Sequence, residues 1–242
     1  MRMHLFLLPV LTFSLSAQEA DLPTQLQRTQ RLGTDALRGL QAKLALDPAP
    51  SEQKAYFQAL VSYTLASQLQ KRDAKASEAL LDRTLKGLEG RKDAESLALM
   101  GACFGLKIGF SPNSGMTLAP KASGLFQQAL KLSPGNPRVL YFQGLHVYHT
   151  PAFFGGGAEK ALPILEAAEK AAREENPTEN AWVPRWGRAE SLAWLALMQL
   201  DQHQAAAAKQ NVEAALTMDE DYAFAAKFVK PKIDAEMAKA PK

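Results

Sequence analysis

Hydrophobic residues recur along most of this chain at steps of three and four, the spacing that places them on one face of an α-helix. The first such run is Leu22, Leu26, Leu37, Leu40 and Leu44. Pro48 ends it, because a proline drives the preceding residue out of the helical conformation. Runs of the same period cover residues 51–69, 74–89, 93–108, 120–132, 137–149, 158–175, 188–200, 203–217 and 220–237. Long alternation of β-branched residues is absent, so the pattern predicts an all-α protein of about ten helices.

Short motifs repeat within these predicted helices, and a repeat of helix pairs sets the architecture of a whole chain. The tetratricopeptide repeat has a large residue, Leu-Gly and an aromatic residue on its first helix, and Ala, Phe, Ala and Pro on its second. The second-helix pattern occurs at Ala122, Phe126, Ala129 and Pro134, at Ala161, Leu165 and Ala168, and at Ala208, Val212 and Ala215. The first-helix pattern is complete at Leu97, Met100, Gly101 and Phe104, and partial at Leu140, Gly144 and Val147 and at Leu192, Leu195 and Ala196.

On these residues the chain resembles a tetratricopeptide repeat protein over residues 95–218, with weaker helical pairs at 52–89 and at both termini. The resemblance implies a short α-solenoid of antiparallel helix pairs, followed by a capping helix and tail over residues 219–242. Small residues where paired helices cross permit close approach, and bulky residues fill the remaining gaps. A helical bundle with accidental matches is the alternative.

The two helices of a repeat are separated by extra residues at two places. The interval from Gly144 to Ala161 is about five residues longer than an uninterrupted repeat requires, and that from Gly101 to Ala122 is about nine longer. Both additions lie between the two helices of a repeat, and therefore at the same end of the predicted stack. Insertions on one face of a solenoid often carry its binding function.

The second insertion, residues 150–157, combines two adjacent phenylalanines with a glycine run that has a permissive backbone. Its members are Thr150, Pro151, Ala152, Phe153, Phe154, Gly155, Gly156 and Gly157. One interpretation is a lip that closes over an apolar ligand or a partner helix. A second is an anion site built from glycine amides and Lys160. A third is a tight turn whose phenylalanines fill the core. A nucleotide-binding loop is not supported, because no strand precedes the glycines and no Gly-Lys-Ser/Thr ending follows.

The same region carries a more particular resemblance. The elements are Thr150-Pro151, Phe154 to Gly157, Lys160-Ala161 and Pro184-Arg185-Trp186-Gly187. A chain that carries these elements in this order resembles exported bacterial repeat proteins. The chain is similar in general plan to the repeat-bearing T component associated with TRAP-type solute transporters. That resemblance implies a component that contacts a periplasmic solute-binding protein, rather than a catalyst.

Residues 1–17 are predicted to be a cleaved signal peptide. A positive charge precedes an apolar run over residues 5–15, and the small residues Ser16 and Ala17 follow. The run is shorter than the about 20 apolar residues that span a bilayer. No cysteine stands at the exit for a lipid anchor. Residues 18–242 are therefore expected to form one periplasmic or secreted domain without stable membrane insertion. A buried amphipathic N-terminal helix is the alternative.

Charge and cysteine content exclude nucleic-acid binding and an internal disulfide. The net charge is only +3, from 28 Lys and Arg against 25 Asp and Glu. Nucleic-acid binders carry a stronger and clustered basic surplus, so this class is excluded. Cys103 is the single cysteine, which rules out an internal disulfide, and its small and apolar neighbours predict a buried position.

Few residues carry recognisable chemistry. His146 and His149 lie one helical turn apart, a spacing that can present two imidazoles to one metal, but no third ligand is evident. We therefore expect packing or partner contact there and no bound metal. The three tryptophans, Trp182, Trp186 and Trp194, lie close together along the chain, where they either anchor a partner or fill helix junctions. Nucleophile-elbow, paired-cysteine and dinucleotide-binding patterns are absent, so no enzymatic activity and no cofactor are predicted.

The sequence thus predicts an exported helical-repeat adaptor that binds a protein or peptide partner through its concave groove and the Phe-Gly insertion. The predicted contact residues are Tyr148, His149, Phe153, Phe154, Gly155, Gly156, Gly157 and Trp186. A first alternative is a periplasmic component, associated with a TRAP-type transporter, that holds a hydrophobic small molecule between helices under the insertion. A second alternative is metal-assisted hydrolysis at His146 and His149.

Overall fold

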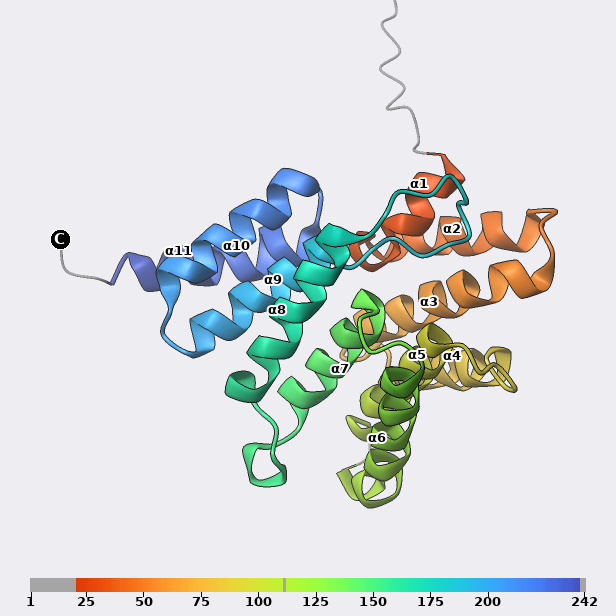
Figure 1. Cartoon of the computed structure of the whole chain (residues 1–242), viewed down its shortest axis with the longest axis horizontal. Helices are drawn as coiled ribbons and strands as arrows, with labels where there is room; N and C mark the ends of the chain where they lie inside the picture. The colour runs from red at the N-terminus through yellow and green to blue at the C-terminus, as the bar shows by residue number, and fades with distance from the viewer. Residues whose placement is uncertain (1–20, 111, 240–242) are drawn as a thin grey trace, which may run out of the picture.

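A computed structural model describes residues 21–110 and 112–239 of the chain, and all regular structure in this part is helical (Figure 1). The longer helices are α2 (Thr34–Leu46), α3 (Ser51–Leu69), α4 (Ala74–Gly87), α5 (Ala94–Ile108), α6 (Gly115–Leu132), α7 (Pro137–His149), α8 (Ala158–Glu174), α9 (Arg188–Asp201) and α10 (Ala205–Met218). Shorter elements are α1 (Leu22–Gln27), η1 (Thr29–Arg31), η2 (Pro112–Ser114), η3 (Ala152–Phe154), η4 (Ala225–Val229) and α11 (Lys230–Met237). The all-α prediction is confirmed, and the predicted signal peptide lies outside the described residues.

Consecutive helices pack in pairs, and the pairs succeed one another in a solenoid-like arrangement (Figure 1). The pairs are α3 with α4, α5 with α6, α7 with α8, and α9 with α10. Contacts of α5 with α7 and of α8 with α9 join neighbouring pairs. The connections after α5 and after α7, which hold the two insertions, both lie at the lower end of the molecule in Figure 1.

Side-chain caps determine where several helices begin. Asp73, Asp93 and Asn136 each accept a hydrogen bond from a backbone N–H in the first turn of α4, α5 and α7. Such a cap stabilises a helix by about 1 kcal/mol, because it satisfies a donor that has no partner within the helix. Pro137 follows its cap at a position where the missing N–H costs nothing.

Two glycines of the repeat pattern lie where paired helices approach closely. A Cβ atom on Gly101 would lie 3.0 Å from the ring of Phe126 on α6. A Cβ atom on Gly144 would overlap Cδ2 of Leu165 on α8, a side chain that is fully buried. The small residues at these crossings therefore allow α5 to pack against α6 and α7 against α8.

The buried residues form two clusters that meet at α9. The larger cluster extends from Leu26 to Met198, and the smaller one joins α9 and α10 to the C-terminal residues up to Ile233. Trp194 packs against both clusters. Cys103 is fully buried in the larger cluster, as predicted.

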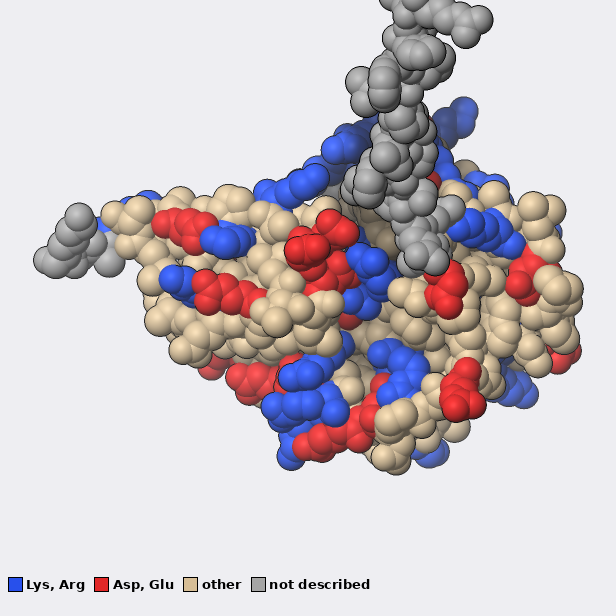
Figure 2. Space-filling view, turned by 90° about the horizontal axis from the view of Figure 1, so that it is seen from above, with Lys and Arg blue, Asp and Glu red and all other residues tan. Residues whose placement is uncertain are grey.

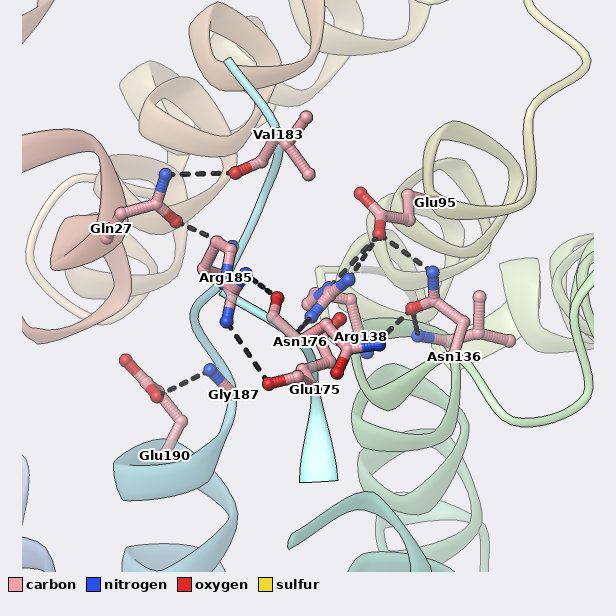
Figure 3. A network of polar contacts seen from close by, with 11 residues as sticks. Gln27, Glu95, Asn136, Arg138, Glu175, Asn176, Val183, Arg185, Gly187 and Glu190 are labelled. Carbon is pink, nitrogen blue, oxygen red and sulfur yellow. Dashed lines mark hydrogen bonds and ion pairs between the residues drawn. The ribbon is translucent and has the colours of Figure 1, made fainter. Parts of the chain in front are cut away.

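Residues of α1 and η1 contact the second half of the chain. Gln27 Nε2 donates to the carbonyl of Ala181 at 3.1 Å. It also donates to the carbonyl of Val183 at 3.1 Å, and the backbone N–H of Arg185 donates to Gln27 Oε1 at 2.6 Å (Figure 3). Segment 175–187, between α8 and α9, therefore runs across the molecule to reach α1 (Figure 1).

Ion pairs strengthen this contact. Arg31 lies 2.9 Å from Glu190 and 3.0 Å from Asp219, and Arg28 lies 2.7 Å from Asp219. Glu190 is buried, and burial raises its pKa, although Arg31 opposes that effect. We call Arg28, Arg31, Glu190 and Asp219 the closing network, because it joins residues near the N-terminus to α9 and to the end of α10.

A second network holds the start of segment 175–187. Arg138 on α7 is buried and pairs with Glu95 on α5 at 2.9 Å and with Glu175 at 2.6 Å (Figure 3). Asn136 also donates to Glu95 at 2.8 Å. This network ties the end of α8 to two earlier helices.

On the face shown in Figure 2, groups of basic side chains lie beside groups of acidic ones, with broad uncharged areas between them. In the part of the chain that the structure describes, no helix combines the length and the apolar character needed to cross a membrane.

Candidate ligand-binding groove

The closing network creates a groove between distant parts of the chain. One wall consists of residues 30–34 together with Gln68 and Arg72 near the end of α3, and the other consists of Tyr222, Ala223, Phe224 and Phe228. The groove is open to solvent and has a volume of about 570 Å³. Small-molecule sites in proteins commonly measure about 300–1,000 Å³, so this volume suits a compact organic ligand.

Hydrogen bonds hold the N-terminal wall against α3. Gln68 Nε2 donates to the Leu32 carbonyl at 2.7 Å, and the Thr34 hydroxyl donates to Gln68 Oε1 at 2.9 Å. The side chain of Gln68 is thus bonded at both ends, which gives the wall a defined position.

Aromatic side chains continue from the groove across the neighbouring helices. We call Tyr148, His149, Trp194, Phe224 and Phe228 the aromatic strip. Ring centroids are 4.9 Å apart for Tyr148 and His149, 5.7 Å for His149 and Trp194, 4.8 Å for Trp194 and Phe224, and 5.5 Å for Phe224 and Phe228. Phe228 is 46% exposed, His149 is exposed, and the other members are half-buried. The rings meet edge to face between Tyr148, His149 and Trp194 and closer to parallel between Trp194, Phe224 and Phe228, so that their exposed parts form one apolar surface.

Three elements present the strip. The last turn of α7 carries Tyr148 and His149, α9 carries Trp194, and Phe224 and Phe228 lie at and within η4. Residues of η4 form a π-helical turn, a rare conformation that occurs frequently at functional sites. The rings of Phe224 and Phe228 are stacked, with an interplanar angle of 20°.

Polar contacts lie at both ends of the aromatic strip. The Tyr148 hydroxyl donates to Asp201 Oδ2 at 2.6 Å. Burial and this acidic partner raise the pKa of Tyr148, so the phenol stays a neutral donor at physiological pH. At the other end, Lys232 Nζ lies 4.2 Å from the centroid of the Phe228 ring.

The two histidines of α7 face different neighbours. His146 packs against the Phe126 ring with centroids 5.0 Å apart, and its Nε2 lies 3.3 Å from the Ser123 hydroxyl. His149 instead contacts Trp194. Burial lowers the pKa of His146, and at His149, whose side chain stays exposed on one side, partial desolvation by the adjacent rings and the neighbouring His146 lower the pKa. Among the described residues, no three His, Cys, Asp or Glu side chains are grouped so that they could hold a metal ion.

The Phe-Gly insertion projects from the molecule. Phe153 is 92% exposed and Phe154 is 74% exposed, and their rings meet edge to face at 5.3 Å. These exposures rule out the interpretation in which the phenylalanines fill the core. The N–H groups of Gly155, Gly156 and Gly157 donate to the carbonyls of Ala152, Pro151 and Val147. The glycine amides are thus engaged by carbonyls of the turn and of α7, which argues against an anion site.

Trp186 is not an exposed anchor, and this part of the sequence prediction is wrong. It is only 2% exposed, and its ring packs edge to face against Tyr141 at 5.2 Å and Phe142 at 5.5 Å. The reason is that segment 175–187 returns over α7 before α9 begins, which brings the indole into the core. Trp182 is half-buried against Phe57.

The structure brings two predicted residues, Tyr148 and His149, together with three that the sequence prediction did not include. Trp194 is one of the three tryptophans of the sequence prediction, whereas Phe224 and Phe228 lie in its predicted capping helix and tail. The four-residue spacing of the two phenylalanines was the available signal, because it places both rings on one helix face.

No protein-family model matches this chain, and no curated protein matches it. Among solved structures, the fold is similar to that of the HusA haemophore from Porphyromonas gingivalis, with a TM-score of 0.55 and 22% sequence identity. The similarity covers 76% of this chain and 96% of that one. Fold and groove together define an all-helical, solenoid-like protein with an aromatic recess of ligand size.

Proposed function

We propose that this protein is an exported, non-enzymatic binding protein that holds a flat, hydrophobic small molecule against the aromatic strip. The observation that carries the proposal is the succession of five contacting rings from three elements, continuing into a groove of about 570 Å³. Apolar pockets with a few polar groups are the usual form of small-molecule sites. Export rests on the predicted signal peptide at residues 1–17.

The similar solved structure supports a particular ligand class. That protein is named a haemophore, and haem is a flat and largely apolar tetrapyrrole. The aromatic strip of this chain offers the stacking and edge-to-face contacts that a tetrapyrrole ring can use. We therefore propose a tetrapyrrole as the ligand.

Removing the central rings tests the proposal. We expect wild-type protein to bind protoporphyrin IX saturably, and a double variant, Trp194→Ala with Phe224→Ala, to bind it at least tenfold more weakly. Porphyrin absorbance measures the affinity, and circular dichroism checks that helical content is preserved. The matched control is Met116→Ala with Leu132→Ala, which removes two exposed apolar side chains of α6, outside the strip. Absence of saturable binding, or equal binding by the strip variant, would overturn the proposal.

A second candidate function is the protein-binding adaptor, which the exposed Phe153 and Phe154 favour. Two large apolar side chains on a short turn are suited to insertion into a pocket of another protein. The proposed partner is a periplasmic solute-binding protein. The close helix crossings at Gly101 and Gly144 support the accompanying proposal that the chain is a tetratricopeptide repeat protein.

A further inference from the structure

We propose that Arg72 and Lys232 form a cationic clamp that binds carboxylate groups of the ligand while its ring system lies on the aromatic strip. This inference rests on the proposed function and names the chemical class of ligand more closely. The predicted ligand is a planar aromatic compound with at least one carboxylate at its edge, such as a tetrapyrrole carrying acidic side chains.

The position of the two cations is the first argument. Arg72 lines the groove from the side of α3, opposite Phe224 and Phe228. Lys232 extends from α11, and its Nζ lies 4.2 Å from the centre of the Phe228 ring. Both side chains are exposed. A ligand that enters the groove beside Phe228 would therefore meet Arg72 in the groove lining, and Lys232 lies next to the same ring.

The lack of ion-pair partners is the second argument. Within residues 21–110 and 112–239, neither Arg72 nor Lys232 forms an ion pair. The other arginine of the groove, Arg31, is neutralised by Glu190 and Asp219. Lys230, close to Lys232 in sequence, pairs with Asp234 at 2.7 Å. The two proposed clamp residues thus keep their charge available to a ligand.

The absence of acidic side chains from the groove lining is the third argument. The groove lining contains no aspartate or glutamate among the described residues. Asp73, next to Arg72 in sequence, directs its carboxylate to the Ala76 N–H at 3.0 Å and caps α4. No acidic side chain of the lining would therefore repel a carboxylate on the ligand.

The chemistry of the two cations suits carboxylate recognition. An arginine guanidinium can bind a carboxylate through two parallel N–H···O bonds. A lysine ammonium over an aromatic ring remains partly hydrated and can exchange that hydration for a carboxylate. Apolar contact along the strip and ionic contact at its rim would together orient a ligand that has one flat and one acidic part.

A pair of ligands with the same ring system tests the clamp. Protoporphyrin IX has two carboxylates, and its dimethyl ester has none; both are titrated in the same dilute detergent. We expect wild-type protein to bind the acid at least tenfold more tightly than the ester, with the difference shrinking as salt is added. The double variant Arg72→Gln with Lys232→Gln should bind the acid about tenfold more weakly and the ester as wild type does.

The control variant is Lys71→Gln with Lys227→Gln, which removes the same charge from neighbouring exposed residues outside the groove lining. It should change the affinity for neither ligand. If acid and ester bind wild-type protein equally, or if the control weakens acid binding as much as the clamp variant does, the clamp is wrong while the proposed function stands. If neither ligand binds, the proposed function itself fails, and the clamp with it.

Discussion

At the scale of single residues, glycines set how closely paired helices pack. Gly144 faces the buried Leu165 across the α7–α8 contact, and any side chain there would overlap it. Gly124, on α6, has no atom within 4 Å of the position that a Cβ would occupy. The same residue type therefore has a packing role at one position and none at the other.

This difference predicts opposite effects of one substitution. Gly144→Ala should lower the free energy of unfolding by about 1–3 kcal/mol, because Leu165 has no free space to move into. Gly124→Ala should raise it by about 0.5–1 kcal/mol, because alanine favours the helix and meets no neighbour. Urea denaturation followed by circular dichroism measures both. A Gly144→Ala variant as stable as wild type would show that the crossing is loosely packed.

At the scale of elements, the turn over residues 150–157 holds two phenylalanines away from the core. Its backbone hydrogen bonds run within the turn and to carbonyls of the last turn of α7, and Gly155 and Gly157 adopt φ angles of +83° and +99°, which favour glycine. The turn therefore keeps its shape without support from the phenylalanine rings.

Replacing both phenylalanines should therefore abolish the binding of a protein partner and leave the free energy of unfolding nearly unchanged. In a Phe153→Ala, Phe154→Ala variant, we expect the free energy of unfolding to change by no more than about 0.5 kcal/mol, because exposed side chains contribute little. We also expect the loss of any protein partner that copurifies with wild type from a periplasmic extract, identified by mass spectrometry. Retention of every partner by a folded variant would eliminate the turn as a docking element.

At the scale of the whole molecule, the closing network decides whether a groove exists. It fixes residues 30–34 beside residues 222–228, which are far apart in sequence. Glu190 is buried and contacts both Arg31 and the N–H of Gly187. Loss of this carboxylate would leave part of the Arg31 charge, on a side chain that is only 13% exposed, unpaired.

We therefore expect Glu190→Ala to destabilise the fold by about 3–5 kcal/mol, the cost of breaking a buried ion pair. Protection of residues 28–34 from hydrogen exchange should fall with it, because these residues would no longer be held against α9. Arg188→Ala is the comparison, since its pair with Glu169 is partly exposed and should contribute no more than about 1 kcal/mol. Equal effects of the two substitutions would refute a special role for the closing network.

The helices, the close crossings at Gly101 and Gly144 and the burial of Cys103 could be predicted from sequence. Each follows from local periodicity or from the size of a residue within a short motif. Trp186 could not be placed, because its burial depends on how segment 175–187 returns over α7. Phe224 and Phe228 were missed, because a polar, charged terminal segment gave no sign that other rings lie beside it.

By itself, the amino-acid sequence determined the helical character of this protein and the succession of helix pairs, since both depend on contacts between residues near in the chain. Only the tertiary structure decided which aromatic rings share a surface. Rings on α7, α9 and η4 become neighbours because stacked pairs bring separate helices together. The opposite wall of the groove forms because buried charges on α9 and at the end of α10 hold the N-terminal residues in place.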